Sequence, residues 1–174
     1  MAKVAGHKIL TTQDVIDLGQ ALLKTSNLYP LRFVTERDFF PLVVTYLNGR
    51  VPALETEVST DHGRIDFQLK GNNPTWLELA VQSRALTDKN CPNIEFPGTD
   101  LGTLYASQNR NELQKLMTEP KEKTRFLLLL DLNGGYNFPK LKSDYRAEAL
   151  DIAGRKSVRV VYVSPNGPEH FKAG

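Results

Sequence analysis

Two acidic residues, Asp66 and Glu78, occupy matching positions in two consecutive stretches that alternate between apolar and polar side chains. The alternation runs over residues 64–70 and again over 76–82, a period of two that is typical of strands with one apolar face. Gly-Asn-Asn-Pro at 71–74 predicts a turn, so the two strands should form an antiparallel hairpin. Matching of the apolar faces then makes Asp66 and Glu78 neighbours, directly opposite or diagonal, with Cβ atoms about 5 to 8 Å apart. Two carboxylates at that separation can share a divalent cation.

A purely structural interpretation of the acidic pair stays open. Like charges on neighbouring strands destabilise a sheet, so some positive charge must compensate Asp66 and Glu78. In this alternative both carboxylates are solvated on the polar face, and Arg64 or Lys70 relieves them. Spacing alone does not decide between this arrangement and a metal site.

The hairpin resembles the core of the PD-(D/E)XK nuclease superfamily, whose motif is an acid on one strand and acid-any-lysine on the next. Gly-Arg-Ile-Asp-Phe at 63–67 and Trp-Leu-Glu-Leu-Ala-Val-Gln at 76–82 carry the resemblance. Asp66 matches the first acid and Glu78 the second, while Ile65 replaces the proline of the motif. The resemblance extends over residues 35–163. It implies a metal-dependent nuclease, with Asp66 and Glu78 as ligands of Mg²⁺ or Mn²⁺.

One position departs from the motif, because Ala80 stands where the superfamily has its lysine. Three explanations are open: a deliberate lysine-to-alanine replacement, a naturally inactive fold, or a substitute from Gln82, Arg84 or Lys115. We favour the first, because a single change at Ala80 would complete the pattern. We therefore expect the catalytic positions to be Asp66, Glu78, Ala80 as the site of the missing lysine, and Gln82.

A third carboxylate for the metal has two candidates. The resemblance implies an acid on the helix before the sheet, and Glu36 is at the matching position, where it alternatively only complements the helix dipole. Glu57 competes with it, because face matching of an earlier strand can place Glu57 opposite Asp66. No His or Cys pair has the spacing of a zinc site, so oxygen ligands and Mg²⁺ or Mn²⁺ are expected.

The elements that position these residues follow from periodicity and capping signals. In chain order we expect a helix over 12–24, a helix over 35–48, strands over 54–58, 64–70 and 76–82, a helix over 100–117, a strand over 125–132, a helix from Ser143 to 153 and a strand over 158–163. The strand over 125–132 is apolar without alternation, which indicates cover on both faces. The order predicts an α/β fold of the restriction-endonuclease-like kind, with a mixed central sheet flanked by helices. In that sheet an antiparallel meander adjoins a parallel crossover.

Length and composition indicate one domain and a reducing compartment. The chain has 174 residues, of which 40% are hydrophobic, enough for a single core. We divide it into an N-terminal helical lead at 1–34, a nuclease-like core at 35–163 and a loose tail at 164–174. A single cysteine, Cys91, excludes an internal disulfide, and no apolar run is long enough to span a bilayer. A soluble cytoplasmic protein with no membrane partner is expected.

Positive charge is uneven along the chain and points to a phosphate-bearing partner. The formal net charge is +2, whereas residues 110–174 contain 12 Lys and Arg against 8 Asp and Glu, a net of +4. A solvated basic surface is the alternative. The nuclease resemblance implies that the phosphate-bearing partner is DNA ahead of RNA. The candidate nucleic-acid contacts are Arg84, Lys115, Lys140, Lys142 and Arg146. The stretch 85–98 has no clean period and is a candidate substrate-facing loop.

Two further function classes stay open on the same scaffold. A nucleic-acid-binding or regulatory protein without catalysis would account for the alanine at position 80. A protein-interaction module, such as an immunity or adaptor protein, would need neither metal nor nucleic acid. A homodimer or a larger complex is compatible with every one of these functions.

Overall fold

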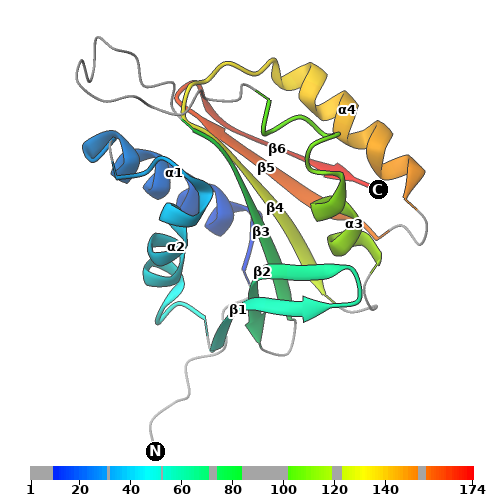
Figure 1. Ribbon diagram of the computed structural model, residues 1–174, viewed down its shortest axis with the longest axis horizontal. Helices are drawn as coiled ribbons and strands as arrows, with labels where there is room; N and C mark the ends of the chain where they lie inside the picture. The colour runs from blue at the N-terminus through cyan, green and yellow to red at the C-terminus, as the bar shows by residue number, and fades with distance from the viewer. Residues whose placement is uncertain are drawn as a thin grey trace, which may run out of the picture.

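The computed structural model describes residues 10–30, 32–51, 53–70, 74–83, 102–118, 123–152 and 156–174. It confirms the predicted α/β class with a mixed central sheet (Figure 1). The six strands lie in the sheet in their order along the chain. They are β1 Ala53–Thr60, β2 Gly63–Lys70, β3 Thr75–Gln82, β4 Thr124–Asp131, β5 Val158–Ser164 and β6 Gly167–Ala173. Strands β3, β4 and β5 are parallel, and the remaining neighbours are antiparallel.

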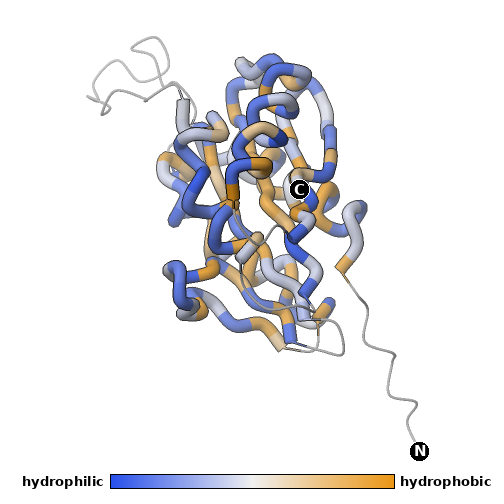
Figure 2. Tube along the Cα trace, turned by 90° about the vertical axis from the view of Figure 1, so that its right-hand side faces the viewer, coloured by the Kyte–Doolittle hydropathy of each residue, from blue (hydrophilic) through white to orange (hydrophobic). Residues whose placement is uncertain are grey.

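Helices cover both faces of the sheet. One face carries α1 (Thr12–Leu28) and α2 (Phe40–Leu47), which is preceded by the 3₁₀ turn η1 (Glu36–Phe39). The other face carries α3 (Arg110–Thr118) and α4 (Phe138–Asp151) (Figure 1). Figure 2 shows hydrophobic stretches of the chain in the interior and hydrophilic stretches along the outside. The sheet therefore separates two apolar cores, one under each helical layer.

Local sequence signals explain where the first helices begin. Thr11 caps α1, because its Oγ1 accepts a hydrogen bond from the Asp14 N–H at 3.2 Å while the Asp14 carboxylate accepts one from the Thr11 N–H at 2.9 Å. Thr35 and Asp38 form the same reciprocal arrangement at η1. Pro41 lies in the first turn of α2, where its missing N–H leaves no intrahelical bond unmade. These starts confirm the capping predictions.

Strand β4 contributes buried side chains to both cores. Phe126, Leu128 and Leu130 belong to the core under α1 and α2, and Leu127 and Leu129 to the core under α3 and α4. All five are fully buried. Each such side chain stabilises the fold by about 1.5 to 3 kcal/mol relative to exposure. The prediction of a strand covered on both sides is confirmed.

The approach of α1 to the sheet depends on a glycine. A Cβ atom placed on Gly19 would lie only 2.6 Å from Cγ2 of the buried Val163 on β5. Contacts that short do not occur between carbon atoms, so α1 can lie this close to β5 only because position 19 lacks a side chain. The helix and the centre of the sheet are thereby fixed against each other.

Two expected boundaries were wrong in the C-terminal half. Helix α4 begins at Phe138 rather than at Ser143, because the Asn137 side chain caps it by accepting the Lys140 N–H at 3.0 Å. Pro139 fits in its first turn. The helix expected over 100–117 is α3 from Arg110, preceded by turns from residue 102; its proposed caps at 99 and 100 lie outside the described residues.

The expected loose tail is a strand. Residues 167–173 form β6, which pairs antiparallel with β5 along its whole length. Phe171 and Ala173 point into the core under α4, while Lys172 between them is exposed, so the alternation of a strand is present but short. Gly167 has φ 119°, a backbone conformation that permits the tight turn from β5. The core therefore continues past residue 164.

The hairpin of β1 and β2 is bent near its middle. Thr56 pairs with Phe67 and Val58 with Ile65, while Glu57 between them has φ 52°, an uncommon value for a residue other than glycine. Beyond the bend Ile65 packs in the core under α3, whereas Phe67 packs in the opposite core. The prediction that both side chains share one face is wrong, because the bend turns the end of β2 across the sheet toward α3 (Figure 1).

Candidate active site: carboxylates around Lys115

The acidic residues gather where β2 and β3 separate. Backbone pairing of these strands ends at Phe67 and Leu77, and the same register places Asp66 opposite Glu78. Beyond that point two N–H groups of β3 lack a strand partner, and carboxylates receive them. Asp66 Oδ2 accepts the Leu79 N–H at 2.9 Å, and the Glu36 carboxylate accepts the Val81 N–H. We call this divergence of β2 and β3, with the side chains gathered in it, the fork. Two carboxylates satisfy its unpaired N–H groups, and Glu36, Asp66 and Glu78 come together there.

A lysine from α3 enters the same fork. Lys115 Nζ lies 2.9 Å from Glu78 Oε1 and donates a hydrogen bond to the Arg64 carbonyl oxygen at 2.8 Å. Glu112, one helical turn earlier, lies 3.6 Å from the same ammonium group. Lys115 is 8% exposed and Glu78 only 1% exposed, so the pair is shielded from water. A buried ammonium is tolerated only with such partners, and the fold supplies three oxygen atoms.

The carboxylates carry more negative charge than the lysine offsets. Burial, reinforced by the nearby Asp66 charge, raises the pKa of Glu78 to about 9. Burial and the charges of Asp66 and Glu112 raise the pKa of Glu36 to about 7. Burial also raises the pKa of Asp66, although hydrogen bonds from Glu78 and from the Leu79 N–H oppose the rise. At neutral pH the fork therefore holds a proton between Asp66 and Glu78, which a cation of higher charge can displace.

Lys115 keeps its own proton in this environment. Burial alone would lower the pKa of its ammonium group, but the neighbouring carboxylates of Glu78, Glu112 and Asp66 outweigh burial and raise the pKa above the usual 10.5. The prediction that Lys115 contacts phosphates from a helix surface does not match this position, because its ammonium points inward. The fork contains a fixed positive charge directly beside the acidic pair.

The cations of the structural alternative are engaged elsewhere. Arg64 lies 3.8 Å from Glu57, and Lys70 pairs with Glu55. Glu57 also pairs with Arg37 at 3.0 Å and is 40% exposed. Glu57 therefore points away from the fork, and of the two candidates for a third carboxylate the structure brings only Glu36 to Asp66.

Ala80 lies in an apolar core. All eight residues of β3 are buried, including those on the face that we expected to be polar. Ala80 is 3% exposed and belongs to the cluster that contains Trp76 and, from α3, Leu113 and Leu116. A lysine at this position would have to extend its charge out of that cluster. Of the three explanations for the missing lysine, the arrangement favours substitution by Lys115.

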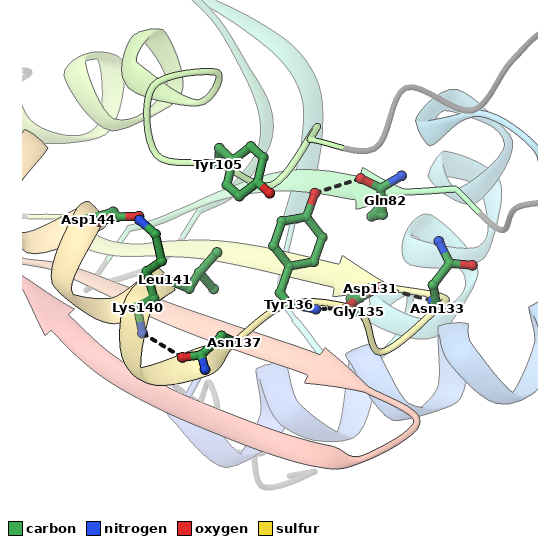
Figure 3. Close-up of a pocket in the computed structure, with 10 residues that line it drawn as sticks. All are labelled: Gln82, Tyr105, Asp131, Asn133, Gly135, Tyr136, Asn137, Lys140, Leu141 and Asp144. Atoms are coloured by element: carbon green, nitrogen blue, oxygen red, sulfur yellow. Dashed lines mark hydrogen bonds and ion pairs between the residues drawn. The ribbon is translucent and has the colours of Figure 1, made fainter.

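The side chain of Gln82 binds backbone N–H groups rather than the acidic pair. It is 1% exposed, and its Oε1 accepts hydrogen bonds from the Gly102 N–H at 3.1 Å and the Thr103 N–H at 3.2 Å. The Tyr136 hydroxyl lies 2.6 Å from the same oxygen (Figure 3). We infer a positioning role, because Gln82 fastens the end of β3 to the segment that leads into α3.

A cavity of about 400 Å³ adjoins Gln82 at the carboxyl ends of β3 and β4 (Figure 3). Tyr105 and Tyr136 meet edge to face in its wall, with ring centroids 5.3 Å apart. Lys140, a predicted phosphate contact, lines this cavity and pairs with Asp144 at 2.6 Å. None of the fork residues lines it; these are Glu36, Asp66, Glu78, Glu112 and Lys115. The cavity offers room, but the strongly shifted carboxylates lie in the fork, and we assign the candidate chemistry there.

The remaining predicted contacts lie on α4 or outside the described residues. Lys142 and Arg146 line a groove beside β6, described below. Arg84 and the stretch 85–98 lie outside the described residues. Glu112 was missed as a member of the fork, although its position three residues before Lys115 on a helix places both on one face and was a usable signal.

The donor set suits a hard divalent cation in part. Mg²⁺ is usually bound by one or two carboxylates and completes its octahedron with water, and Asp66 and Glu78 offer that pair. Within the described ranges, no three His, Cys, Asp or Glu side chains are arranged to hold a metal ion. The two carboxylates thus meet the minimum requirement for Mg²⁺ or Mn²⁺ once the proton that they share has left.

Comparison with known proteins adds no relative. No described helix is both long and apolar enough to cross a membrane. A scan of the sequence against models of known protein families gives no match, and a search of curated proteins gives none either.

Proposed function

We propose that this chain is a metal-dependent nuclease that hydrolyses phosphodiester bonds, with DNA as the expected substrate ahead of RNA. One observation carries the proposal: Lys115 Nζ lies 2.9 Å from Glu78 Oε1, and Glu78 is hydrogen-bonded to Asp66. Two acids and a lysine, the three components of the motif that the hairpin resembles, thus meet although the lysine comes from α3. The resemblance supplies the reaction class and the contacts supply its missing component.

Asp66 and Glu78 are the residues that would hold Mg²⁺ or Mn²⁺, with Glu36 beside them. A bound divalent ion would make a water molecule more acidic and offset charge on the scissile phosphate. Because a carboxylate must be deprotonated to act as a ligand, Glu78 would give up the proton it holds at neutral pH. Metal binding should therefore release protons and strengthen as pH rises.

Lys115 would act as a positive charge and a proton donor. Its pKa is raised, so the ammonium cannot accept a proton at neutral pH. Glu78 Oε1 and the Arg64 carbonyl fix its direction. From that position it can stabilise negative charge on a phosphate oxygen and pass a proton to the leaving oxygen.

Cleavage of plasmid, single-stranded DNA and RNA with Mg²⁺ or Mn²⁺ tests the proposal. Asp66→Asn should abolish cleavage, and Lys115→Met should lower turnover by about 10² to 10⁴, the range for a general acid. Lys115→Arg separates the two roles, because a guanidinium keeps the charge but donates no proton at neutral pH. Lys24→Met on the exposed side of α1 is the matched control. Parental activity in Lys115→Met would remove Lys115 from the mechanism.

Ala80→Lys tests the competing explanation of the motif. If Lys115 carries the role, this variant gains no activity and loses stability, because a charge enters the cluster of Trp76 and Leu116. Cleavage that appears only in Ala80→Lys would instead show that a lysine has been lost from β3.

A binding or regulatory protein without catalysis is the second candidate. This candidate is supported by Glu78, which is 1% exposed and already paired with Lys115. Glu78 thus has a charged partner within the fork without a metal ion. Titration with Mn²⁺ separates the candidates. The nuclease predicts binding that Asp66→Asn weakens, whereas nucleic-acid binding without metal binding favours the second candidate. Neither kind of binding would favour the protein-interaction alternative.

A further inference from the structure

A basic groove runs along the outer edge of the sheet, beside β6. It encloses about 720 Å³ between the first residues of α1, one side of α4 and the strands β5 and β6. The basic side chains that line it are Lys142, Arg146, Arg159, His170 and Lys172. Among the described residues that line it there is no aspartate or glutamate. We call this surface the β6 groove.

Two of its cations directly oppose each other. Arg159 on β5 is the register partner of Lys172 on β6. Directly opposite Cβ atoms in an antiparallel pair lie about 5 Å apart, and like charges at that separation destabilise the sheet. Arg146 on α4 adds a third positive charge beside β6, because its Nε donates a hydrogen bond to the Lys172 backbone carbonyl oxygen at 3.3 Å. Stability of the fold alone does not account for this arrangement.

Within the described part of the chain, none of the five basic side chains forms an ion pair. Arg159 lies over the Phe126 ring, 5.8 Å from its centroid, an arrangement that does not neutralise charge. Lys140, at the start of the same helix as Lys142, shows the contrast, since it pairs with Asp144. The positive charge of the groove is thus left for a ligand.

The layout suits a chain of phosphates. Lys142 and Arg146 are one turn of α4 apart, so their Cβ atoms lie about 5 to 6 Å apart. The Cβ atoms of Arg159 and Lys172 on the strands lie about 5 Å apart. Duplex DNA carries one charge per about 3.4 Å along each strand, so several phosphates can meet several cations. Among the described residues that line the groove, Phe171 is the one large apolar side chain, and it is buried, so none of them could insert into a lipid layer. A nucleic-acid backbone fits better than a membrane surface.

We infer that the β6 groove binds the phosphodiester backbone of a nucleic acid at a distance from the chemical centre. Strands β4 and β5 separate β6 from β3, so β6 lies about 14 Å from the strand that carries Glu78. The groove therefore anchors the nucleic acid and takes no part in bond cleavage. The choice of nucleic acid as the polyanion rests on the proposed function.

Fluorescence anisotropy with a labelled duplex tests the groove in EDTA, where no cleavage occurs. Lys172→Glu should weaken binding and reduce the slope of log K against log salt by about 0.9 for each phosphate that the variant no longer neutralises. The same variant should melt at the parental temperature or above it, because the new carboxylate faces Arg159. Lys24→Glu changes the net charge equally on an exposed part of α1 outside the groove, and should leave the slope unchanged. A decrease in affinity together with an increase in stability is a result that a purely structural lysine cannot give.

Failure of the groove is distinguishable from failure of the nuclease proposal. Equal weakening by Lys24→Glu and Lys172→Glu would overturn the inference, as would vesicles of anionic lipid that bind with the same dependence on Lys172. Groove-dependent binding without cleavage under any metal would refute the nuclease alone. Cleavage with parental affinity in Lys172→Glu and Arg159→Gln would refute the groove alone.

Discussion

Replacing Glu78 with glutamine tests whether the fork holds an extra proton at neutral pH. In the folded protein the pKa of Glu78 is raised from 4.5 to about 9 by burial and by Asp66. Between these values the folded chain binds one more proton than the unfolded chain, so stability must fall as pH rises. The favourable contribution is complete below about pH 4.5 and is lost as pH passes through about 9. Glutamine cannot ionise, and it keeps the shape of the side chain.

The magnitude follows from the number of protons released. Each proton bound only by the folded state gives a slope of about 1.4 kcal/mol per pH unit. Glu36, with a pKa of about 7, contributes a diminishing share of the slope between pH 7 and 8, so Glu78 alone sets the slope above about pH 8. Lys115 titrates above 10.5 and stays outside this window. For a domain of this size about 1.4 kcal/mol corresponds to roughly 3 to 6 °C in melting temperature.

Thermal melts in EDTA between pH 7 and 8.5 measure this slope directly. The parent should lose melting temperature steadily, and Glu78→Gln should show a nearly flat profile above about pH 8 in the same buffers. Glu169→Gln on the exposed side of β6 removes a negative charge far from the fork and should follow the parent. Parallel profiles for the parent and Glu78→Gln would refute the assignment of the shared proton.

Three further outcomes are expected. Mg²⁺ or Mn²⁺ should raise the melting temperature by mass action, more at pH 9 than at pH 6, and Asp66→Asn should remove the effect; a melting temperature that ignores both ions contradicts the site. Gly19→Ala should destabilise the fold by about 1 to 3 kcal/mol in denaturant melts, because its Cβ would lie 2.6 Å from Val163, and an unchanged midpoint would disprove the close packing of α1. Asp131→Ala should cost about 3 kcal/mol or more, since this fully buried carboxylate accepts the Tyr162 hydroxyl at 2.7 Å and three backbone N–H groups. A cost below about 1 kcal/mol would show that these bonds are replaced by water.

Elements with strong local signals were predictable from the sequence. Thr11 and Thr35 mark helix starts through reciprocal hydrogen bonds that involve only the next few residues. The apolar run of β4 needs burial on both faces whatever its neighbours are. Asn137 followed by Pro139 is an equally good signal for the start of α4, because asparagine caps helices and proline is tolerated in their first turn.

The composition of the fork was only half predictable. Period and turn chemistry brought Asp66 to Glu78, because the hairpin is local. Lys115 is 37 positions from Glu78 along the chain, and their ion pair depends on how α3 packs over the bent end of β2, which no short pattern encodes. The bend at Glu57 was equally hidden, since a positive φ at a glutamate leaves no mark in the sequence.

The hydrogen bonds of Gln82 have a consequence for how the chain can vary. Its Oε1 accepts the N–H groups of Gly102 and Thr103, so the end of β3 is held directly against the described segment that begins at residue 102. The entropy of closing a loop grows only with the logarithm of its length, and a doubling costs about 0.6 kcal/mol. Insertions or deletions between positions 83 and 101 should therefore cost the core little as long as Gln82 is kept. The buried amide of Gln82 should thus allow the length of this segment to change during evolution with little effect on the stability of the sheet.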